Sequence, residues 1–259
     1  MDDSPPLRPD WPAPAAVRAF VTTRTMPGNS KPPYDAFNLG LRSGEEEAVV
    51  RANRDLLARA FGLPSMPRWL RQVHGTDVAV LDAAVEAGER TADAAITRER
   101  GVVLAIQTAD CLPLLLCAED GSEIGAVHAG WRGLSSGVIE ACVGRMQTPA
   151  PKLMAWLGPA IGGNSYEVGE EVRAAFLAHD RNAAEAFRAT RPGHWLCDLY
   201  ALARQRLSSL GASRISGGEF DTFADPRFYS YRRDGANSGR LASLIWIEPR
   251  SVFAHASTL

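Results

Sequence analysis

The sequence has few histidines, almost no lysine and no long apolar run. No apolar stretch approaches the roughly 20 residues that a bilayer-spanning helix needs. Residues 1–14 are acidic and rich in proline, unlike a secretion signal, and the formal net charge of −2 favours neither a nucleic-acid nor a membrane-surface partner. We therefore expect a cytoplasmic protein, monomeric or weakly homo-oligomeric, that acts on a small molecule.

The four cysteines lack the regular spacing of a disulfide framework, and we expect reduced thiols. Cys117 follows Cys111 in an apolar run, Cys142 falls at a buried position of a predicted helix, and Cys197 has no polar signal beside it. These three are predicted to pack in the core. Cys111 differs because it ends the polar signal Ala-Asp-Cys.

Two histidines stand in similar signals, His74 in Gln-Val-His-Gly and His128 in His-Ala-Gly-Trp-Arg-Gly. One thiolate and two imidazoles suit zinc or copper, and three protein ligands leave one coordination position open for water or substrate. Structural zinc sites usually gather ligands in tight pairs, whereas these three are 37 and 17 residues apart. The alternative is a buried cysteine and two histidines that merely end strands. We favour a metal site assembled by the fold.

Hydrophobic patterns predict a mixed α/β (α+β) fold, with mixed sheet covered by helices and no repeat or domain boundary. A proline-rich N-terminal arm (1–14) precedes one catalytic domain (15–259). Ser43 is predicted to cap the first helix. The Asp120-Gly121 turn predicts a hairpin. Predicted strands cover 16–22, 68–73, 77–81, 102–108, 112–118, 123–127, 153–157 and 241–247, and predicted helices cover 45–61, 134–146, 168–179 and 199–210.

Seven segments together resemble the YfiH-like family, also labelled polyphenol oxidase or laccase-domain proteins. The resemblance runs from about residue 17 to 248, and Ala-Asp-Cys followed by His-Ala-Gly-Trp-Arg-Gly is its most specific part. The chain departs from the family pattern at Asp221, where many relatives have cysteine, and at Gly163-Asn164. The segments are 22–24 (Thr-Thr-Arg), 38–40 (Asn-Leu-Gly), 72–75, 108–113, 128–133, 158–162 and 229–234 (Tyr-Ser-Tyr-Arg-Arg-Asp).

The resemblance implies a single-domain layered α-β-β-α sandwich with mixed sheets. It implies a zinc site, alternatively a copper site, at the metal-binding and catalytic residues His74, Cys111 and His128. Family members are described as purine nucleoside phosphorylases that act on adenosine, inosine, guanosine and methylthioadenosine, and that also deaminate adenosine. Older descriptions call them copper-dependent phenol oxidases, and some resemble peptidoglycan-precursor-editing amidases.

Phosphorolysis of a purine nucleoside requires a phosphate site as well as a metal. The candidate anion donors are Arg24, Arg54 and Arg132, the last beside glycines at a predicted helix start. Asn38 is a candidate hydrogen-bond partner of the substrate, and Asp110 a candidate ligand-orienting group, base or substrate contact. Each arginine has a simpler alternative role in a surface ion pair or a turn. Arg232 and Arg233 with Tyr229 form either substrate contacts or a solvated surface, and Trp131 either stacks on a base or packs in the core.

Three rival functions remain, and one of them is a binding protein with a structural metal, which the wide spacing of the three ligands disfavours. A multicopper oxidase needs about eight imidazoles for its trinuclear cluster, more than the five histidines of this chain supply. One copper site, with Met154 as a weak axial ligand, suits electron transfer instead. A cysteine hydrolase would use Cys111 as nucleophile and His128 as base.

Overall fold

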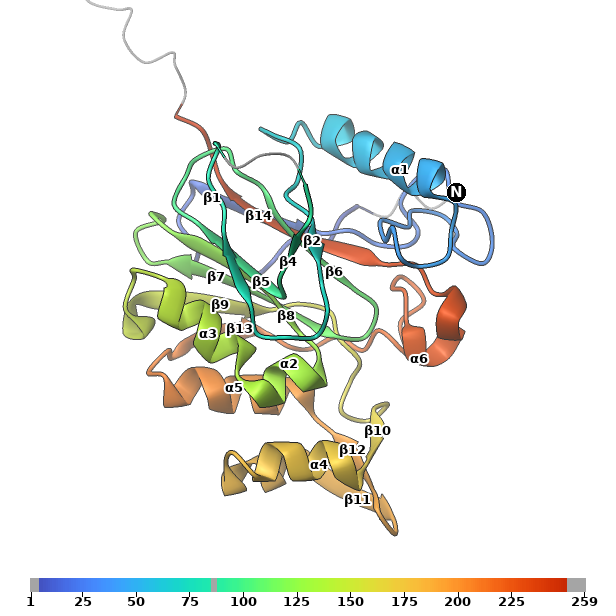
Figure 1. Cartoon of the computed structure of the whole chain (residues 1–259), viewed down its shortest axis with the longest axis vertical. Helices are drawn as coiled ribbons and strands as arrows, with labels where there is room; N and C mark the ends of the chain where they lie inside the picture. The colour runs from blue at the N-terminus through green and yellow to red at the C-terminus, as the bar shows by residue number, and fades with distance from the viewer. Residues whose placement is uncertain (1–4, 85–87, 251–259) are drawn as a thin grey trace, which may run out of the picture.

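Two β-sheets lie face to face between helical layers (Figure 1). The computed structural model describes residues 5–84 and 88–250. Helix α1 (Glu47–Ala60) covers the outer face of the smaller sheet. On the far side, α2 (Trp131–Ser136), α3 (Val138–Arg145) and α5 (Leu199–Ser209) cover the larger sheet. The mixed α/β prediction is therefore confirmed, with layers in the order α-β-β-α.

The smaller sheet is antiparallel, in the order β1 (Val17–Val21), β14 (Leu241–Ile247), β6 (Leu104–Thr108). The larger sheet is mixed, with antiparallel pairing at its centre and parallel pairing at both edges. Its order is β13 (Arg214–Gly217), β9 (Leu153–Leu157), β7 (Leu112–Ala118), β8 (Ile124–Ala129), β5 (Ala94–Thr97), β3 (Val78–Val80).

Smaller elements surround this core. A third sheet and α4 (Glu170–Leu177) lie below the main layers in Figure 1. This sheet has the order β10 (Glu167–Gly169), β12 (His194–Cys197), β11 (Phe187–Arg191). The remaining elements are β2 (Leu70–Arg71) paired with β4 (Arg90–Thr91), the short helix α6 (Tyr231–Asp234), and the 3-10 helices η1 (Ala150–Lys152), η2 (Arg181–Ala186) and η3 (Gly235–Asn237).

Continuous apolar strands fill three separate cores. In β7, Leu114 and Leu116 face the lower helices, whereas Leu115 and Cys117 face the other sheet. In β14, Leu241, Ile245 and Ile247 pack between the sheets, and Leu244 and Trp246 pack under α1. Successive side chains of a strand point to opposite faces, so a strand buried on both faces is apolar throughout. This explains why the sequence shows uninterrupted apolar runs here.

Three local expectations are wrong. Ser43 does not cap α1, because the helix begins after Glu46 and the Ser43 hydroxyl donates to Gly40 O at 2.8 Å. The predicted helix 134–146 is two helices, since Gly137 adopts φ 96° between α2 and α3. The predicted helix 168–179 begins only at Glu170, because 167–169 pairs with β12.

The N-terminal segment is anchored at one point by backbone hydrogen bonds. Leu7 and Val21 exchange N–H···O bonds of 2.9 and 2.8 Å, and Leu7 and Trp11 pack against the core between the sheets. Within residues 5–84 and 88–250, no helix is long and apolar enough to cross a membrane.

Candidate metal centre

His74, Cys111 and His128 come together at one end of the larger sheet. Their ligand atoms all lie within 4.8 Å of one another, with Cys111 Sγ 3.8 Å from His74 Nε2. The pairing of β7 with β8 places two of the three residues, Cys111 and His128. Cys111 directly precedes β7 and His128 is in β8, where it pairs with Pro113. His74 arrives from the loop after β2, and the imidazole rings of the two histidines meet edge to face at 4.8 Å.

Asp93 organises two of these three residues. The carboxylate is fully buried, and its Oδ1 lies 2.8 Å from His128 Nδ1. It also accepts backbone N–H groups of Val73, His74 and Gly75 at 3.1, 2.9 and 2.7 Å. His128 therefore turns its Nε2 toward the cluster, while the loop carrying His74 is fixed by the same carboxylate. A carboxylate behind a metal-ligating histidine fixes its tautomer and orientation.

Backbone strain coincides with this site. His74 has φ 60° and the residue before Cys111, Asp110, has φ 83°. Among the described residues these are the non-glycine residues with positive φ, a conformation that costs about 1–3 kcal/mol and persists only where the surroundings enforce it. The Asp110 carboxylate is held by Thr222 Oγ1 and Arg232 N, each at 2.6 Å.

Two glycines of the His-Ala-Gly-Trp-Arg-Gly segment make room for the cluster. A Cβ on Gly130 would lie 2.9 Å from Cys111 Sγ and 2.9 Å from the His74 ring. A Cβ on Gly133 would lie 2.9 Å from the carbonyl oxygen of Gly75. The segment therefore supplies His128 and then two glycines, whose lack of a side chain leaves room for Cys111 and for the loop that carries His74.

The electrostatics of the cluster favour an ionised thiol. Burial opposes ionisation of Cys111, but the charge of His128 and the hydrogen bonds from both histidines lower the pKa of this thiol to about 6. Burial likewise opposes charge on His128, while the Cys111 thiolate and Asp93 raise the pKa of His128 to about 9. Burial also disfavours the Asp93 carboxylate, yet its hydrogen bonds, first that of His128, hold its pKa below the usual value. Without metal, these pKa shifts favour a thiolate at Cys111, an imidazolium at His128 and a carboxylate at Asp93 near neutral pH.

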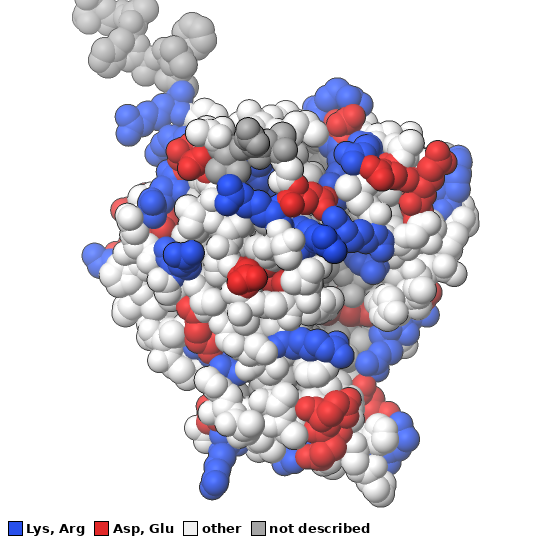
Figure 2. Space-filling view, in the orientation of Figure 1, with Lys and Arg blue, Asp and Glu red and all other residues white. Residues whose placement is uncertain are grey.

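The cluster lies in a cavity of about 510 Å³. Basic side chains gather across the middle of this face of the molecule (Figure 2). Aromatic and cationic side chains form half of the remaining lining residues, and Arg132 stacks on Trp131 at 4.4 Å. These lining residues are Trp131, Tyr166, Tyr231, Arg42, Arg132, Arg232 and Arg240.

The structure separates the other candidate residues. Asp110 and Arg132 line the cavity with the cluster. Asn38 is fully buried and bonds to protein groups, among them Ser43 Oγ at 2.7 Å. Arg54 lies on a second cavity, ion-paired to Glu89 at 3.0 Å. Met154 packs between the sheets opposite Cys117 and not in the cluster.

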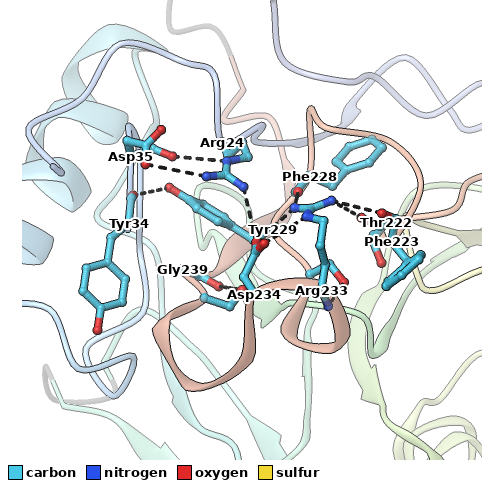
Figure 3. A network of polar contacts seen from close by, with 12 residues as sticks. Arg24, Tyr34, Asp35, Thr222, Phe223, Phe228, Tyr229, Arg233, Asp234 and Gly239 are labelled. Carbon is cyan, nitrogen blue, oxygen red and sulfur yellow. Dashed lines mark hydrogen bonds and ion pairs between the residues drawn. The ribbon is translucent and has the colours of Figure 1, made fainter. Parts of the chain in front are cut away.

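Arg24 and Arg233 belong to a network that fixes the segment around α6 (Figure 3). Arg24 is ion-paired with Asp35 at 3.6 Å and with Asp234 at 3.3 Å. Arg233 donates to the carbonyls of Thr222, Phe223 and Phe228. Tyr229 is fully buried and donates to Tyr34 O at 2.6 Å, so it is not part of a solvated surface. The network supports the chain that brings Thr222 and the Arg232 amide to Asp110.

Sequence reasoning missed Asp93, Tyr166 and Arg240. Asp93 stands before β5, a short strand of two alanines, isoleucine and threonine within a polar stretch, where strand signals are weak. Tyr166 and Arg240 precede β10 and β14 with no motif around them. Asp221, a departure from the family pattern, accepts Gly162 N and Ser165 Oγ at 3.0 and 2.5 Å and so holds a turn.

Fold and site define a four-layer α/β protein with a His-Cys-His cluster in an arginine-lined cavity. The family model described as multi-copper polyphenol oxidoreductase laccase matches residues 18–248, and the chain belongs to this laccase-domain, YfiH-like family. The family description mentions several copper ions. Among residues 5–84 and 88–250, however, the fold gathers one group of potential metal ligands, which consists of His74, Cys111 and His128.

Similar proteins cover nearly the whole chain. The purine nucleoside phosphorylase of Xylella fastidiosa (strain 9a5c) is 53% identical over 248 residues, covering 92% of this chain and 95% of that protein. Purine nucleoside phosphorylase YfiH of Escherichia coli (strain K12) is 47% identical, with 92% and 97% covered. The crystal structure of Neisseria meningitidis protein NMB0706 superposes with a TM-score of 0.90 at 42% identity, covering 95% of this chain and 100% of that chain.

Proposed function

We propose that this protein is a zinc-dependent purine nucleoside phosphorylase that also deaminates adenosine. Its substrates are adenosine, inosine, guanosine and methylthioadenosine, with inorganic phosphate as cosubstrate. The observation that carries the proposal is a His-Cys-His cluster open to an arginine-lined cavity. Relatives about half identical to the chain are named purine nucleoside phosphorylases.

The residues of the cluster fit zinc. In a tetrahedral site with Zn–S of about 2.3 Å and Zn–N of about 2.0 Å, a sulfur and a nitrogen ligand lie about 3.5 Å apart. Cys111 Sγ and His74 Nε2 are 3.8 Å apart, and Asp93 holds His128 from behind. When bound, the metal would supply a Lewis acid and a water of lowered pKa.

The protein groups around the cluster suit a nucleoside and an anion. Tyr166, Tyr231 and Trp131 offer aromatic faces to a purine. Arg132, at the first turn of α2, and the other cavity arginines favour phosphate. Asp110, which is fixed by Thr222 and the Arg232 amide, orients the turn that presents Cys111.

The test uses purified protein whose metal content is measured, before and after chelation and zinc return. Each preparation receives the nucleosides with and without phosphate, and products are identified by mass spectrometry. We expect base and a ribose phosphate only when zinc and phosphate are both present, and inosine from adenosine without phosphate. Equal base release in phosphate-free buffer would contradict phosphorolysis, and full activity with copper alone would contradict zinc.

A second candidate function is amide hydrolysis by Cys111. Cys111, His128 and Asp93 correspond to a nucleophile, a base and an orienting carboxylate. The lowered pKa of the Cys111 thiol supports a role as nucleophile. Metal-free protein that cleaves a muramyl peptide amide, and loses this activity on alkylation of Cys111, would favour this function. Metal-free protein inactive on such amides would exclude it.

A further inference from the structure

The buried Arg54 and the partly buried Arg240 line two neighbouring cavities and differ in the groups that balance their charge. Arg54 donates to Glu89 at 3.0 Å, to Leu39 O at 3.0 Å and to Gln107 Oε1 at 3.3 Å, and its guanidinium lies 4.0 Å from the Trp69 ring. Every part of that cation has a protein partner.

Arg240 is less completely paired, although its guanidinium lies 5.9 Å from the Tyr231 ring and the charges of Cys111 and Asp110 act on it without a direct bond. Its Nη1 donates to the carbonyls of Ser238 and Gly239 at 2.6 and 2.9 Å. Within the described part of the chain no carboxylate forms an ion pair with it, although burial lowers its pKa as it does for Arg54. A partly buried cation without an ion-pair partner is costly, and an anion bound in the cavity would offset that cost.

The Asn-Leu-Gly motif holds Arg240 in place. Asn38 Oδ1 accepts the backbone N–H groups of both Gly40 and Arg240, at 2.9 and 2.8 Å, and Leu39 N donates to Arg240 O at 3.2 Å. A Cβ on Gly40 would lie 2.5 Å from Arg240 Cγ. The motif therefore leaves only enough space for the stem of Arg240.

A second polar group without a partner stands beside Arg240. Thr108 lines the same cavity and pairs in register with Leu241, the residue after Arg240. Its hydroxyl is buried and has no hydrogen-bond partner in the described structure, which is unfavourable for a buried polar group. Two under-satisfied polar side chains thus lie at adjacent positions of one cavity wall.

We infer that Arg240 binds the phosphate cosubstrate and that Asn38 and Gly40 are positioning residues for it. This rests on the proposed phosphorolysis. There, a phosphate oxygen forms a bond to C1′ of the ribose as the C1′–N bond breaks, and the electron pair and a proton go to the purine nitrogen. With Nη1 held by backbone carbonyls, Nε and Nη2 of Arg240 remain for a two-point contact with an oxyanion.

The other cavity arginines are less suited to this contact. Arg42 is ion-paired to Glu89 at 2.7 Å, and Arg232 donates to Glu167 O at 2.9 Å. Arg132 is exposed and stacks on Trp131, so it is hydrated and placed for a supporting contact. Arg240 combines partial burial, a fixed backbone position and the absence, within the described residues, of an ion-pair partner.

The first test compares the zinc-loaded wild-type enzyme with Arg240→Met, Arg240→Lys and the surface control Arg145→Met. Loss of a charged hydrogen-bond pair predicts a KM for phosphate raised about 10- to 100-fold in Arg240→Met. We expect an intermediate rise in Arg240→Lys, and no change in zinc content or in the KM for nucleoside. Titration of the holoenzyme with inorganic phosphate, followed by calorimetry, should show the same order without turnover.

The second test is a double-mutant cycle. Gly40→Ala should raise the KM for phosphate by displacing Arg240. In an Arg240→Gly background, which lacks both the Cγ at 2.5 Å and the Cβ at 2.9 Å that the new methyl group would meet, Gly40→Ala should add little. Additive losses in the two variants would overturn the positioning role of Gly40.

The outcomes separate the two proposals. A wild-type enzyme that cleaves nucleosides without phosphate refutes the proposed function itself. A phosphate-dependent enzyme in which Arg240→Met keeps its KM for phosphate, or changes only its KM for nucleoside, refutes the role of Arg240. If Gly40→Ala does not fold, phosphate titration of Arg240→Met and Arg240→Lys still decides.

Discussion

Two cysteines at the two ends of β7 have opposite chemistry. Cys117, inside the strand, faces the core between the sheets opposite Met154, and burial raises the pKa of its thiol to about 12. Cys111, just before the strand, has its pKa lowered to about 6 by His128 and His74 despite burial. The residue type is the same, but Cys111 follows the polar Ala-Asp pair, whereas Cys117 stands within an apolar run. Their surroundings in the fold also differ. At the strand end two imidazoles lie beside the Cys111 thiol, whereas the Cys117 thiol packs in the apolar core between the sheets.

The largest expected effect comes from removing the thiol at the strand end. Cys111→Ala should eliminate both bound zinc and nucleoside cleavage while the protein stays folded, because a metal left with two imidazoles has lost its only anionic ligand. Zinc per chain by elemental analysis and circular dichroism measure the two parts. Stoichiometric zinc in folded Cys111→Ala would remove the basis of the metal-site proposal.

The next contrast is thiol reactivity in metal-free protein. Because the thiolate is the nucleophile, alkylation of Cys111 should be slow below about pH 6 and level off above it, where the lowered pKa leaves the thiol ionised. Cys117 and Cys142, with pKa values near 12, should react only after unfolding. Peptide mass spectrometry of protein alkylated between pH 5 and 9 measures each site. Alkylation of Cys117 at the rate of Cys111 would erase the distinction.

A smaller effect is expected at the carboxylate behind the cluster. Asp93→Asn keeps the shape but removes the charge that orients His128, so zinc affinity should fall about 10- to 100-fold. Competition with a chelating dye measures it. Asp120→Asn, in an exposed turn, is the control and should bind zinc like the wild type. An unchanged affinity in Asp93→Asn would restrict Asp93 to a structural role.

The smallest effect concerns the core thiols. Alanine at Cys117, Cys142 or Cys197 should lower the free energy of unfolding by about 1–2 kcal/mol each, since each leaves a small cavity in a packed core. Zinc content should stay at the wild-type value. Denaturant unfolding and elemental analysis report the two quantities. A folded triple variant without zinc would show that the ligand thiol is another one.

Long apolar runs made the main strands predictable. The predicted bounds 112–118, 153–157 and 241–247 equal those of β7, β9 and β14, because a strand buried on both faces leaves an unbroken apolar pattern. β5 and the small sheet of β10, β11 and β12 were not predicted. Their residues are short runs of mixed polarity, and pairing partners from elsewhere in the chain determine their conformation.

The sequence by itself determined the apolar layers and the chemical types of the three clustered potential ligands, because burial and ligand softness are properties of single side chains. Only the tertiary structure decided what stands behind and beside them. Asp93 reaches His128 across 35 positions, and Asn38 holds Arg240 across 202. Hydrogen bonds of this kind depend on strand register and loop paths, which no local pattern encodes. For that reason Asn38 looked like a substrate contact in the sequence and is a support for Arg240 in the fold.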